Sequence, residues 1–499
     1  MKIVSEPLKI LVCSAEMVPF AKTGGLADVT GALPKALARL GHDVRVVLPR
    51  YGRIDLGRFN ITEELSSFSV PMDAASETVS VLKTDSVPGV PVYFVNSEKY
   101  FTREGIYGYP DDGERFILFC RAALEMLRRL NWQPDIIHCN DWHTGIIPNW
   151  LKTIYRNDPF FERTATVFTI HNLQYQGLFG WRILEVAGID EYGFLHHPEI
   201  GELAEVVDLM ARGLHFSDVI NTVSERYAQE ILTPQFGEKL DPLLHDRQDR
   251  LFGILNGVDY DEINPATDKY IAKNFDVEHL EDRVANKLAL QKEANLPQDP
   301  DIPLIGMVSR MVDQKGFDLL AECFDAMMQC VNVQFVLLGT GDQHYHNVFQ
   351  KFAETYPNRA AIYLTFNAAL AQKIYAGSDM FLMPSRFEPC GLGQMISLHY
   401  GSIPIVRQTG GLADTIQDFE PTNQTGNGFS FDRYDQIDLY TAVVRAVENY
   451  KYRSTWQMLR ERGMRADFSW GASARRYEDL YRKALEFHAS PSQSATMGR

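Results

Sequence analysis

Short apolar runs alternate with amphipathic segments along most of the chain. The runs that predict strands are 8–13, 43–49, 91–97, 134–141 and 165–172 in the first half, and 303–310, 333–342, 360–366, 379–385 and 402–408 in the second. Helices are predicted near 29–40, 113–130, 144–155 and 471–487. Apolar strands separated by helices are typical of parallel sheets covered on both faces. The pattern therefore predicts an α/β protein with two doubly wound, Rossmann-like domains that face each other.

The boundary between the two domains is expected within 250–265, where Asn256, Gly257 and Pro265 provide turn residues. A charged, helix-rich stretch follows before the strand pattern resumes. We predict an N-terminal domain at 1–250, a C-terminal domain at 251–468, a last helix at 469–487 and a disordered polar tail at 488–499.

Composition and charge narrow the class of protein. The 499 residues are 45% hydrophobic and 23% charged, with a net charge of −16. This negative charge argues against nucleic-acid binding, which usually needs a basic face. The six cysteines are scattered, without a CxxC pair, which is typical of reduced cytoplasmic thiols. A strand-like run at residue 8 leaves no room for a signal peptide, and no apolar stretch approaches the ~18 residues of a membrane span. We expect a cytoplasmic protein with no membrane partner, and the sequence leaves its oligomeric state open.

The hexapeptide TGGLAD occurs twice, at 23–28 and at 409–414. Each copy follows a predicted strand and precedes a helical pattern. In doubly wound sheets ligands bind beyond the carboxyl ends of the strands, and a Gly-Gly turn can present N–H groups to an anion. The repetition favours one ligand addressed by both copies. The alternative is that each glycine pair only allows a tight turn.

Three cations lie at the ends of predicted strands. Lys22 precedes the first Gly-Gly pair, and Arg310 and Lys315 occupy the segment VSRMVDQKGFD. A guanidinium fork and an ammonium suit the two halves of a pyrophosphate, so phosphate binding is favoured over solvated side chains.

The loop PSRFEPCGLGQ, at 384–394, lies between a predicted strand and a predicted helix. Glu388 could accept sugar hydroxyls or face a developing positive charge, and its alternative is a helix cap. The N–H groups of Cys390, Gly391 and Leu392 could hold phosphate. Cys390 has no base nearby in sequence that would make it a nucleophile.

Histidines and carboxylates also end predicted strands, in IIHCNDWHTG and FTIHNLQYQG. These segments contain His138, Asp141, His143 and His171, but their spacing matches no known zinc site. We therefore predict no metal site. A GTGD segment at 339–342 lacks the third glycine of a dinucleotide fingerprint, and no P-loop sequence occurs.

Seven motifs occur in the order found in bacterial glycogen synthases and plant starch synthases. They are KTGGLADV, TIHNLQYQG, NGVD, VSRMVDQKGFD, LGTGD, PSRFEPCGLGQ and TGGLADTI. The chain resembles this family from about residue 8 to 487. The resemblance implies a GT-B fold with a deep cleft and a C-terminal helix that crosses back to the first domain. It also implies a retaining hexosyltransferase without metal or cofactor, which transfers glucose from ADP-glucose to the non-reducing 4-hydroxyl of an α-1,4-glucan such as a glycogen or starch primer.

The same resemblance assigns roles residue by residue. Catalytic roles fall on Glu388, His171, Arg310 and Lys315. Donor binding falls on Lys22, Gly24, Gly25, Asn256, Phe366, Cys390, Gly391, Leu392, Thr409, Gly410 and Gly411. The acceptor side is expected to contain Asp28, Tyr107 and Asp141.

Some positions depart from the family pattern. Ile263 stands where the family often has Trp, Gly393 where Thr is common, and DLMARGL at 208–214 replaces the usual NFLKAGL. These departures bear on donor and acceptor preference. Two alternatives therefore stay open: a related retaining enzyme that uses UDP-glucose, and a catalytically weak glucan-binding regulator. Phosphorolysis of glucan would need a pyridoxal phosphate lysine that the sequence does not identify.

Overall fold

A computed structural model describes residues 6–73, 75–189 and 206–490 of the chain. The chain forms two compact units, one made of residues 1–257 and 470–499, the other of 258–469. The division falls at 257/258, within the stretch 250–265 where the boundary was expected and seven residues beyond the predicted end of the N-terminal domain at 250. The reason is that β11 (Leu251–Gly253) pairs with β10 (Val219–Thr222) and so belongs to the first sheet.

The first unit is built on a nine-stranded sheet with the order β11-β10-β7-β6-β1-β2-β5-β4-β3. Its other strands are β1 (Lys9–Cys13), β2 (Asp43–Pro49), β3 (Thr62–Met72), β4 (Ala75–Thr84), β5 (Val92–Asn96), β6 (Ile136–Asn140) and β7 (Ala165–Ile170). A small sheet pairs β8 (Leu178–Gly180) with β9 (Val206–Asp208). The helical segments are α1 (Gly25–Arg39), α2 (Asp112–Arg129), η1 (Trp142–Thr144), α3 (Ile146–Lys152), α4 (Arg182–Ala187), α5 (Leu209–Phe216), α6 (Glu225–Glu230), α7 (Asp241–Asp246), η4 (Gln248–Arg250) and α16 (Trp470–Ala489).

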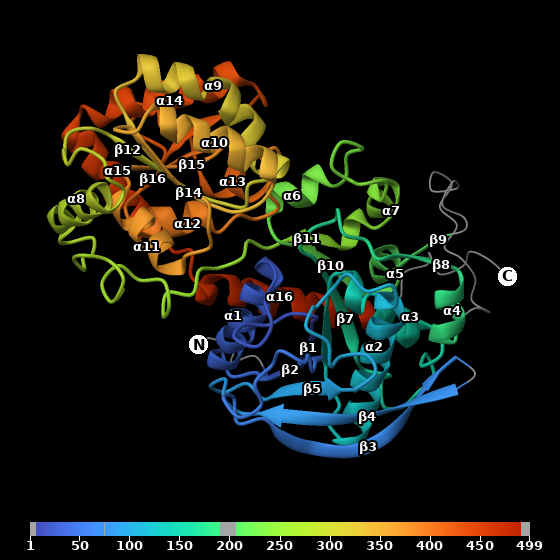
Figure 1. Cartoon of the computed structure of the whole chain (residues 1–499). Helices are drawn as coiled ribbons and strands as arrows, with labels where there is room; N and C mark the ends of the chain where they lie inside the picture. Colours follow the sequence, from blue (N-terminus) through green and yellow to red (C-terminus); the bar gives the residue numbers. More distant parts are fainter. Residues whose placement is uncertain (1–5, 74, 190–205, 491–499) are drawn as a thin grey trace. The chain divides into compact units, whose positions relative to one another are not determined.

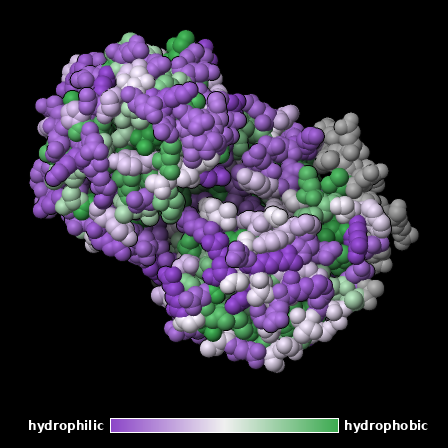
Figure 2. All heavy atoms as spheres, in the orientation of Figure 1, coloured by the Kyte–Doolittle hydropathy of each residue, from purple (hydrophilic) through white to green (hydrophobic). Residues whose placement is uncertain are grey.

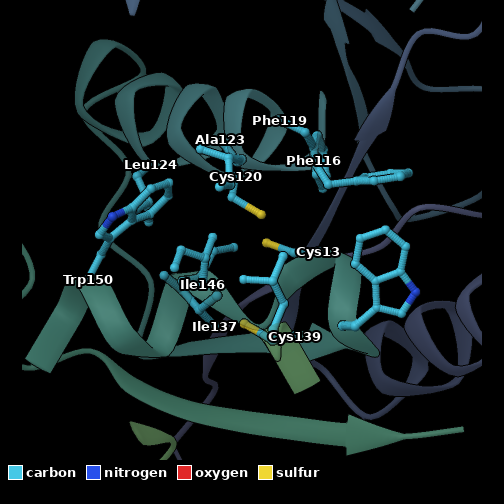
Figure 3. Close-up of a cluster of buried hydrophobic side chains, with 14 of the residues drawn as sticks. Cys13, Phe116, Phe119, Cys120, Ala123, Leu124, Ile137, Cys139, Ile146 and Trp150 are labelled. Atoms are coloured by element: carbon cyan, nitrogen blue, oxygen red, sulfur yellow. The ribbon is translucent and has the colours of Figure 1, made fainter. Parts of the chain in front are cut away.

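Strand β1 shows why this sheet forms. Leu11 and Cys13 pack with α2 on one face, whereas Ile10 and Val12 pack with α1 and α16 on the other. Successive side chains of a strand point to opposite faces, so a strand covered on both faces must be apolar throughout. Figure 3 shows the first of these cores, with the sulfurs of Cys13 and Cys120 pointing toward each other between α2 and the strands.

One edge of the first sheet differs from the expected pattern. The pairs β3–β4 and β4–β5 are antiparallel, and β3 and β4 form a long hairpin that the sequence analysis did not predict. Most residues of β3 are exposed or half-buried. Because β3 is mostly exposed, its sequence is polar and lacks the apolar run that marks the central strands.

The last helix returns to the first unit. Tyr477 accepts a hydrogen bond from Asn221 at 3.0 Å, and the hydroxyl of Tyr481 lies 2.9 Å from His138 Nδ1. His488 lies within α16, and its Nδ1 is 3.2 Å from Asp218. It is therefore not part of the tail expected at 488–499. The rest of that tail, 491–499, lies outside the described residues.

The second unit contains a six-stranded parallel sheet with the order β14-β13-β12-β15-β16-β17. The strands are β12 (Leu304–Val308), β13 (Gln334–Leu338), β14 (Ala360–Tyr363), β15 (Met380–Met383), β16 (Ile403–Arg407) and β17 (Phe429–Phe431). The helical segments are η5 (Leu280–Asp282), α8 (Arg283–Glu293), η6 (Asp313–Lys315), α9 (Phe317–Cys330), α10 (Gln343–Thr355), α11 (Ala368–Gly377), α12 (Gly393–His399), α13 (Gly410–Thr415), α14 (Gln436–Tyr450) and α15 (Arg453–Arg465). Figure 1 shows these helices around the sheet.

Two apolar cores cover the faces of the second sheet. One includes side chains of α9, α10, α14 and α15, and the other includes side chains of α8 and α11. Each unit therefore has the doubly wound α/β organisation that the pattern predicts. On the face drawn in Figure 2, hydrophobic residues form small groups among hydrophilic ones. Within the described residues, no helix is both long enough and apolar enough to cross a membrane.

Candidate active site

In the second unit, three neighbouring strands deliver the predicted site residues. Strands β12, β15 and β16 are adjacent and parallel, so the loops that follow them meet at one edge of the sheet. These loops contain Lys315, Glu388 and Thr409 respectively. Topology alone therefore brings together segments that are up to 94 residues apart in the sequence.

Lys315 and Glu388 form an ion pair at this edge. The ammonium of Lys315 lies 2.8 Å from Oε1 and 2.6 Å from Oε2 of Glu388. Their side chains are 16% and 7% exposed, so the pair is largely shielded from water. The hydroxyl of Ser385, a residue that the sequence analysis did not single out, donates to Oε2 at 3.0 Å. The carboxylate is thus held in one orientation by two donors.

A glycine allows the loops that carry this pair to approach closely. Gly316 has φ +76°, and a Cβ at this position would lie 2.1 Å from the carbonyl oxygen of Pro384. The N–H of Arg386 donates to the carbonyl of Gln314 at 2.9 Å. Only glycine fits here without moving the backbone, which explains why it follows Lys315.

The second Gly-Gly turn packs against the loop of Glu388. A Cβ on Gly410 would lie 1.9 Å from the carbonyl oxygen of Glu388, and one on Gly411 would lie 2.0 Å from that of Cys390. The Gly411 N–H donates to the Glu388 carbonyl at 3.1 Å. This amide is therefore committed within the protein, and the turn positions the loop that carries the carboxylate.

The neighbouring segment 390–394 is fixed from within. Gln394, also missed by the sequence analysis, donates to the carbonyls of Cys390 at 3.1 Å and Gly391 at 2.9 Å. Gly391 has φ +72°, a region that favours glycine. Cys390 is buried, whereas Leu392 is half-buried.

The remaining donor candidates of this unit reach solvent. Arg310 is exposed after β12 and makes no ion pair within the part of the chain that the structure describes. Phe366 follows β14 and is 87% exposed. The glycines of the GTGD segment serve packing, because a Cβ on Gly339 or Gly341 would lie 2.3 Å from the carbonyl oxygen of Ser309 or Met311.

In the first unit, β1, β6 and β7 are adjacent and parallel, and their ends bring a second group of candidates together. The N–H of His171 donates to Asp141 Oδ1 at 2.8 Å, and His171 Nε2 lies 2.9 Å from Asn140 Oδ1. Asn140 was not predicted as a site residue. Asp141 adopts φ +54°, which few non-glycine residues do. Such backbone strain is frequent at functional sites.

Burial sets the protonation of this group. It raises the pKa of Asp141 to about 7, although the N–H groups of His171 and Asn172 oppose the rise. Desolvation by the surrounding protein lowers the pKa of His171 to about 3, so its imidazole is neutral at physiological pH. A neutral imidazole can donate and accept hydrogen bonds without adding a charge.

Tyr107 lies beside the same strand ends. Its ring stacks on His143, with centroids 4.9 Å apart and an interplanar angle of 27°. Burial lowers the pKa of His143 to about 3, and its Nδ1 is buried without a hydrogen-bond partner among the described residues. The Tyr107 hydroxyl donates to Glu16 at 2.6 Å.

The first Gly-Gly turn is held by a carboxylate of the protein itself. Lys22 pairs with Asp28 at 2.6 Å on the surface, where their side chains are 51% and 33% exposed. The N–H groups of Thr23 and Gly24 both donate to Glu16 Oε2, the second at 3.1 Å. A Cβ on Gly24 or Gly25 would meet nothing within 4 Å.

Two further predictions concern Asn256 and metal. Asn256 follows β11, is 7% exposed and has a side-chain oxygen without a partner among the described residues. An unpartnered buried acceptor is uncommon in folded proteins and is suited to a ligand donor.

Residues 6–73, 75–189 and 206–490 include no group of three His, Cys, Asp or Glu side chains placed to hold a metal ion.

Known proteins resemble this chain over nearly all of its length. A family model described as the starch synthase catalytic domain matches residues 9–246, and one described as glycosyl transferases group 1 matches 289–458. A glycogen synthase of Moorella thermoacetica is 50% identical over 486 residues, covering 97% of this chain and 98% of the relative. The chain belongs to the glycogen synthase family. The resemblance inferred from the motifs is thereby confirmed.

Further relatives agree with this assignment. A glycogen synthase of Desulforudis audaxviator is 48% identical, with 96% of this chain and 97% of the relative covered. The solved catalytic domain of starch synthase IV from Arabidopsis thaliana, bound to ADP and acarbose, has a TM-score of 0.88 and 36% identity, covering 96% of this chain and all of that one. A sucrose-phosphate synthase from Thermosynechococcus elongatus, 18% identical with a TM-score of 0.60 and coverages of 96% and 99%, shares the fold. The protein thus has the GT-B fold and is a hexosyltransferase of glycogen synthesis.

Proposed function

We propose that the protein transfers glucose from ADP-glucose to the non-reducing 4-hydroxyl of an α-1,4-glucan, with retention of configuration. The observation that carries this proposal is the shielded Lys315–Glu388 pair at the ends of β12 and β15. The ADP and acarbose bound to the Arabidopsis starch synthase support a nucleoside diphosphate donor and an oligosaccharide acceptor.

Lys315 and Arg310 would stabilise the leaving diphosphate. As the bond between the sugar and the phosphate breaks, negative charge grows on ADP, so a preorganised cation stabilises the transition state more than the bound substrate. The ammonium of Lys315 has three N–H donors, and its two contacts with Glu388 leave a third for a phosphate oxygen. Removing one such donor typically lowers turnover by about 10²–10³.

Glu388 would act on the sugar side of the same bond. Its carboxylate can accept glucose hydroxyls and favour the positive charge of an oxocarbenium-like transition state. Among the described residues, Lys315 and Ser385 are the side chains hydrogen-bonded to it, and the motifs of the sequence indicate no second carboxylate that would act as a covalent nucleophile. We therefore favour a same-face displacement. The bond from C1 to the phosphate oxygen breaks, the bond from C1 to the acceptor oxygen forms, and the acceptor proton moves to the departing phosphate.

The first unit would supply the remaining contacts. We assign Lys22, Gly25 and Asn256 to the donor, and the neutral His171 to the transferred glucose. Asp141 and Tyr107 are assigned to the acceptor, whose hydroxyls suit a carboxylate and an aromatic ring. The exposed Lys22 and the open space beside Gly25 support these assignments.

Two donor substrates distinguish this proposal from its alternatives. Incorporation of radiolabelled glucose into a maltooligosaccharide should be faster from ADP-glucose than from UDP-glucose, and NMR of the product should show a new α-1,4 linkage. Faster transfer from UDP-glucose would contradict the donor assignment. Absence of transfer from both donors would favour a glucan-binding regulator.

A variant of Glu388 tests the chemistry at the pair. Glu388→Gln should keep ADP-glucose binding while turnover falls at least about a hundredfold. Glu354→Gln, at an exposed position on α10, is the matched control and should leave turnover unchanged. Near-normal turnover of Glu388→Gln would refute the role of this carboxylate.

A further inference from the structure

A single carboxylate joins two loops that are far apart in the sequence. Glu16 Oε2 accepts the N–H groups of Thr23 and Gly24, and Oε1 accepts the hydroxyl of Tyr107 at 2.6 Å. Glu16 is 4% exposed, and no lysine or arginine of the described segments pairs with it. Three hydrogen-bond donors from the two loops therefore hold this carboxyl group.

The backbone of Glu16 is fixed as firmly as its side chain. Its carbonyl accepts the hydroxyls of Ser14 at 2.7 Å and Thr30 at 2.5 Å, and its N–H donates to Ser14 Oγ at 3.2 Å. Ser14 directly follows β1, and Thr30 belongs to α1. Glu16 is thus anchored to the sheet and to the helix that the first Gly-Gly turn begins.

The Glu16 carboxylate lies before the N-terminus of α1, where a bound anion could otherwise accept the free N–H groups. N–H groups that precede a helix attract negative charge, and α1 is a 15-residue helix beginning at Gly25. Because Glu16 already takes the amides of Thr23 and Gly24, these two N–H groups do not face a substrate phosphate. The surfaces left for ligand are Lys22 and the open side of Gly24 and Gly25.

The hydrogen bond from Tyr107 to Glu16 connects this carboxylate to the acceptor candidates. The Tyr107 ring stacks on His143, and the N–H of Thr144 in the same turn donates to the Asp141 carbonyl at 3.1 Å. A shift of Tyr107 would therefore change the packing next to Asp141. We propose that Glu16 is a positioning residue that couples the donor-side turn at 22–25 to the acceptor-side loop of Tyr107, an inference that rests on the donor and acceptor assignments above.

A double-mutant cycle measures this coupling. Tyr107→Phe removes one arm, and Glu16→Ala removes both. If the loops are coupled, Tyr107→Phe raises the KM for ADP-glucose as well as for maltooligosaccharide, about tenfold, and this donor effect disappears in the Glu16→Ala background. Glu16→Gln retains an acceptor for the amides and a donor toward Tyr107, so it should recover most of the loss and serves where the alanine variant folds poorly.

Glu77 provides the matched control. It accepts a hydrogen bond from the hydroxyl of Tyr100 at 3.3 Å and pairs with Lys99, but it lies on β4, which is separated from β1 by β2 and β5 in the sheet. Glu77→Gln and Tyr100→Phe should leave both KM values unchanged. Equal KM changes in this control pair and in the Glu16 and Tyr107 variants would overturn the proposal.

Hydrogen exchange gives a readout that does not depend on catalysis. Peptides covering residues 20–30 should exchange faster in Glu16→Ala and in Tyr107→Phe than in the wild type. Wild-type protein that transfers no glucose would refute the proposed function and leave this test intact. An active wild type whose variants lose only thermal stability, with unchanged exchange and KM values, would show that Glu16 is merely structural and would overturn the inference.

Discussion

The two TGGLAD segments have the same six residues but use their glycines in opposite ways. At 409–414 the glycines are buried, and a Cβ on either would lie within 2.0 Å of a backbone carbonyl oxygen of the Glu388 loop. At 23–28 a Cβ on either glycine would meet nothing within 4 Å. The second pair is required for packing, whereas the first leaves a surface open to a ligand.

The surroundings of the two turns explain this difference. The second turn begins α13, a six-residue helix, and the Gly411 N–H is taken by the Glu388 carbonyl. The first turn begins the long helix α1, and its leading amides are taken by the Glu16 carboxylate. Sequence identity over six residues therefore fixes a turn before a helix, and the packing partners decide what that turn does.

The largest effect should come from adding a methyl group to the second turn. Gly410→Ala and Gly411→Ala each place Cβ about 2 Å from backbone that cannot move alone, and Gly410 also has φ +45°. We expect a loss of about 5 kcal/mol or more in unfolding free energy, or failure of the second unit to fold. Chemical denaturation followed by circular dichroism measures this loss.

Gly24→Ala and Gly25→Ala are the matched variants in the first turn. Their unfolding free energies should stay within about 0.5 kcal/mol of wild type, because the added methyl group meets open space. Their KM for ADP-glucose should rise. Equal destabilisation by both pairs of variants would contradict the contrast between the two turns.

Removing the lysine that pairs with Glu388 should destabilise the protein more than removing the lysine that precedes the first turn. Lys315→Met leaves the Glu388 carboxylate shielded without its partner, which should cost about 3–5 kcal/mol. Lys22→Met breaks an exposed pair with Asp28 and should change stability by less than about 1 kcal/mol. Denaturation midpoints of the two variants, each with an activity assay, test this. A larger loss for Lys22→Met would reverse the comparison.

The unfolding free energy should depend on pH through Asp141. Its pKa is raised to about 7 in the folded protein, against 3.8 for an ordinary aspartate, so the unfolded chain releases its proton first. Stability is therefore lost as pH rises from about 4 to about 7, and the penalty is constant above that range. Asp141→Asn should gain roughly 2 kcal/mol at pH 8 and little at pH 4.5. A gain that does not grow with pH between these values would contradict the raised pKa.

The smallest expected change in stability is at Phe366. Its ring is 87% exposed, so Phe366→Ala should shift the unfolding free energy by less than about 0.5 kcal/mol. If Phe366 binds the donor, as the family resemblance implies, the KM for ADP-glucose should rise about threefold to tenfold on loss of the ring, while that for glucan stays the same. An unchanged donor KM would remove Phe366 from the donor site.

The sequence predicted the fold best where the apolar pattern was compatible with only one type of secondary structure. Strands such as β1 and β2 are apolar on both faces, and their helices follow at regular spacing. The β3–β4 hairpin was missed because its exposed strands lack that pattern. The boundary at 257/258 lies within the predicted stretch 250–265, but the first unit extends past residue 250 because β11 pairs with β10, whose residues lie 31 positions earlier in the chain.

The candidate site was predictable in its residue types but not in its contacts. Lys315 and Glu388 could be named from their loops, but their ion pair depends on the adjacency of β12 and β15. The link that Glu16 makes to the Tyr107 loop could not be read from the sequence, because Tyr107 lies 91 residues away. Ser385 and Gln394, by contrast, contact residues only three or four positions away, Glu388 and Cys390, so the short spacing within this loop could have identified them.

The most direct test of the account is a crystal structure of the protein with ADP. We expect oxygens of the diphosphate within hydrogen-bonding distance of the Lys315 ammonium and the Arg310 guanidinium, with Glu388 still beside Lys315. A nucleotide bound elsewhere, with both cations far from its phosphates, would contradict the central claim.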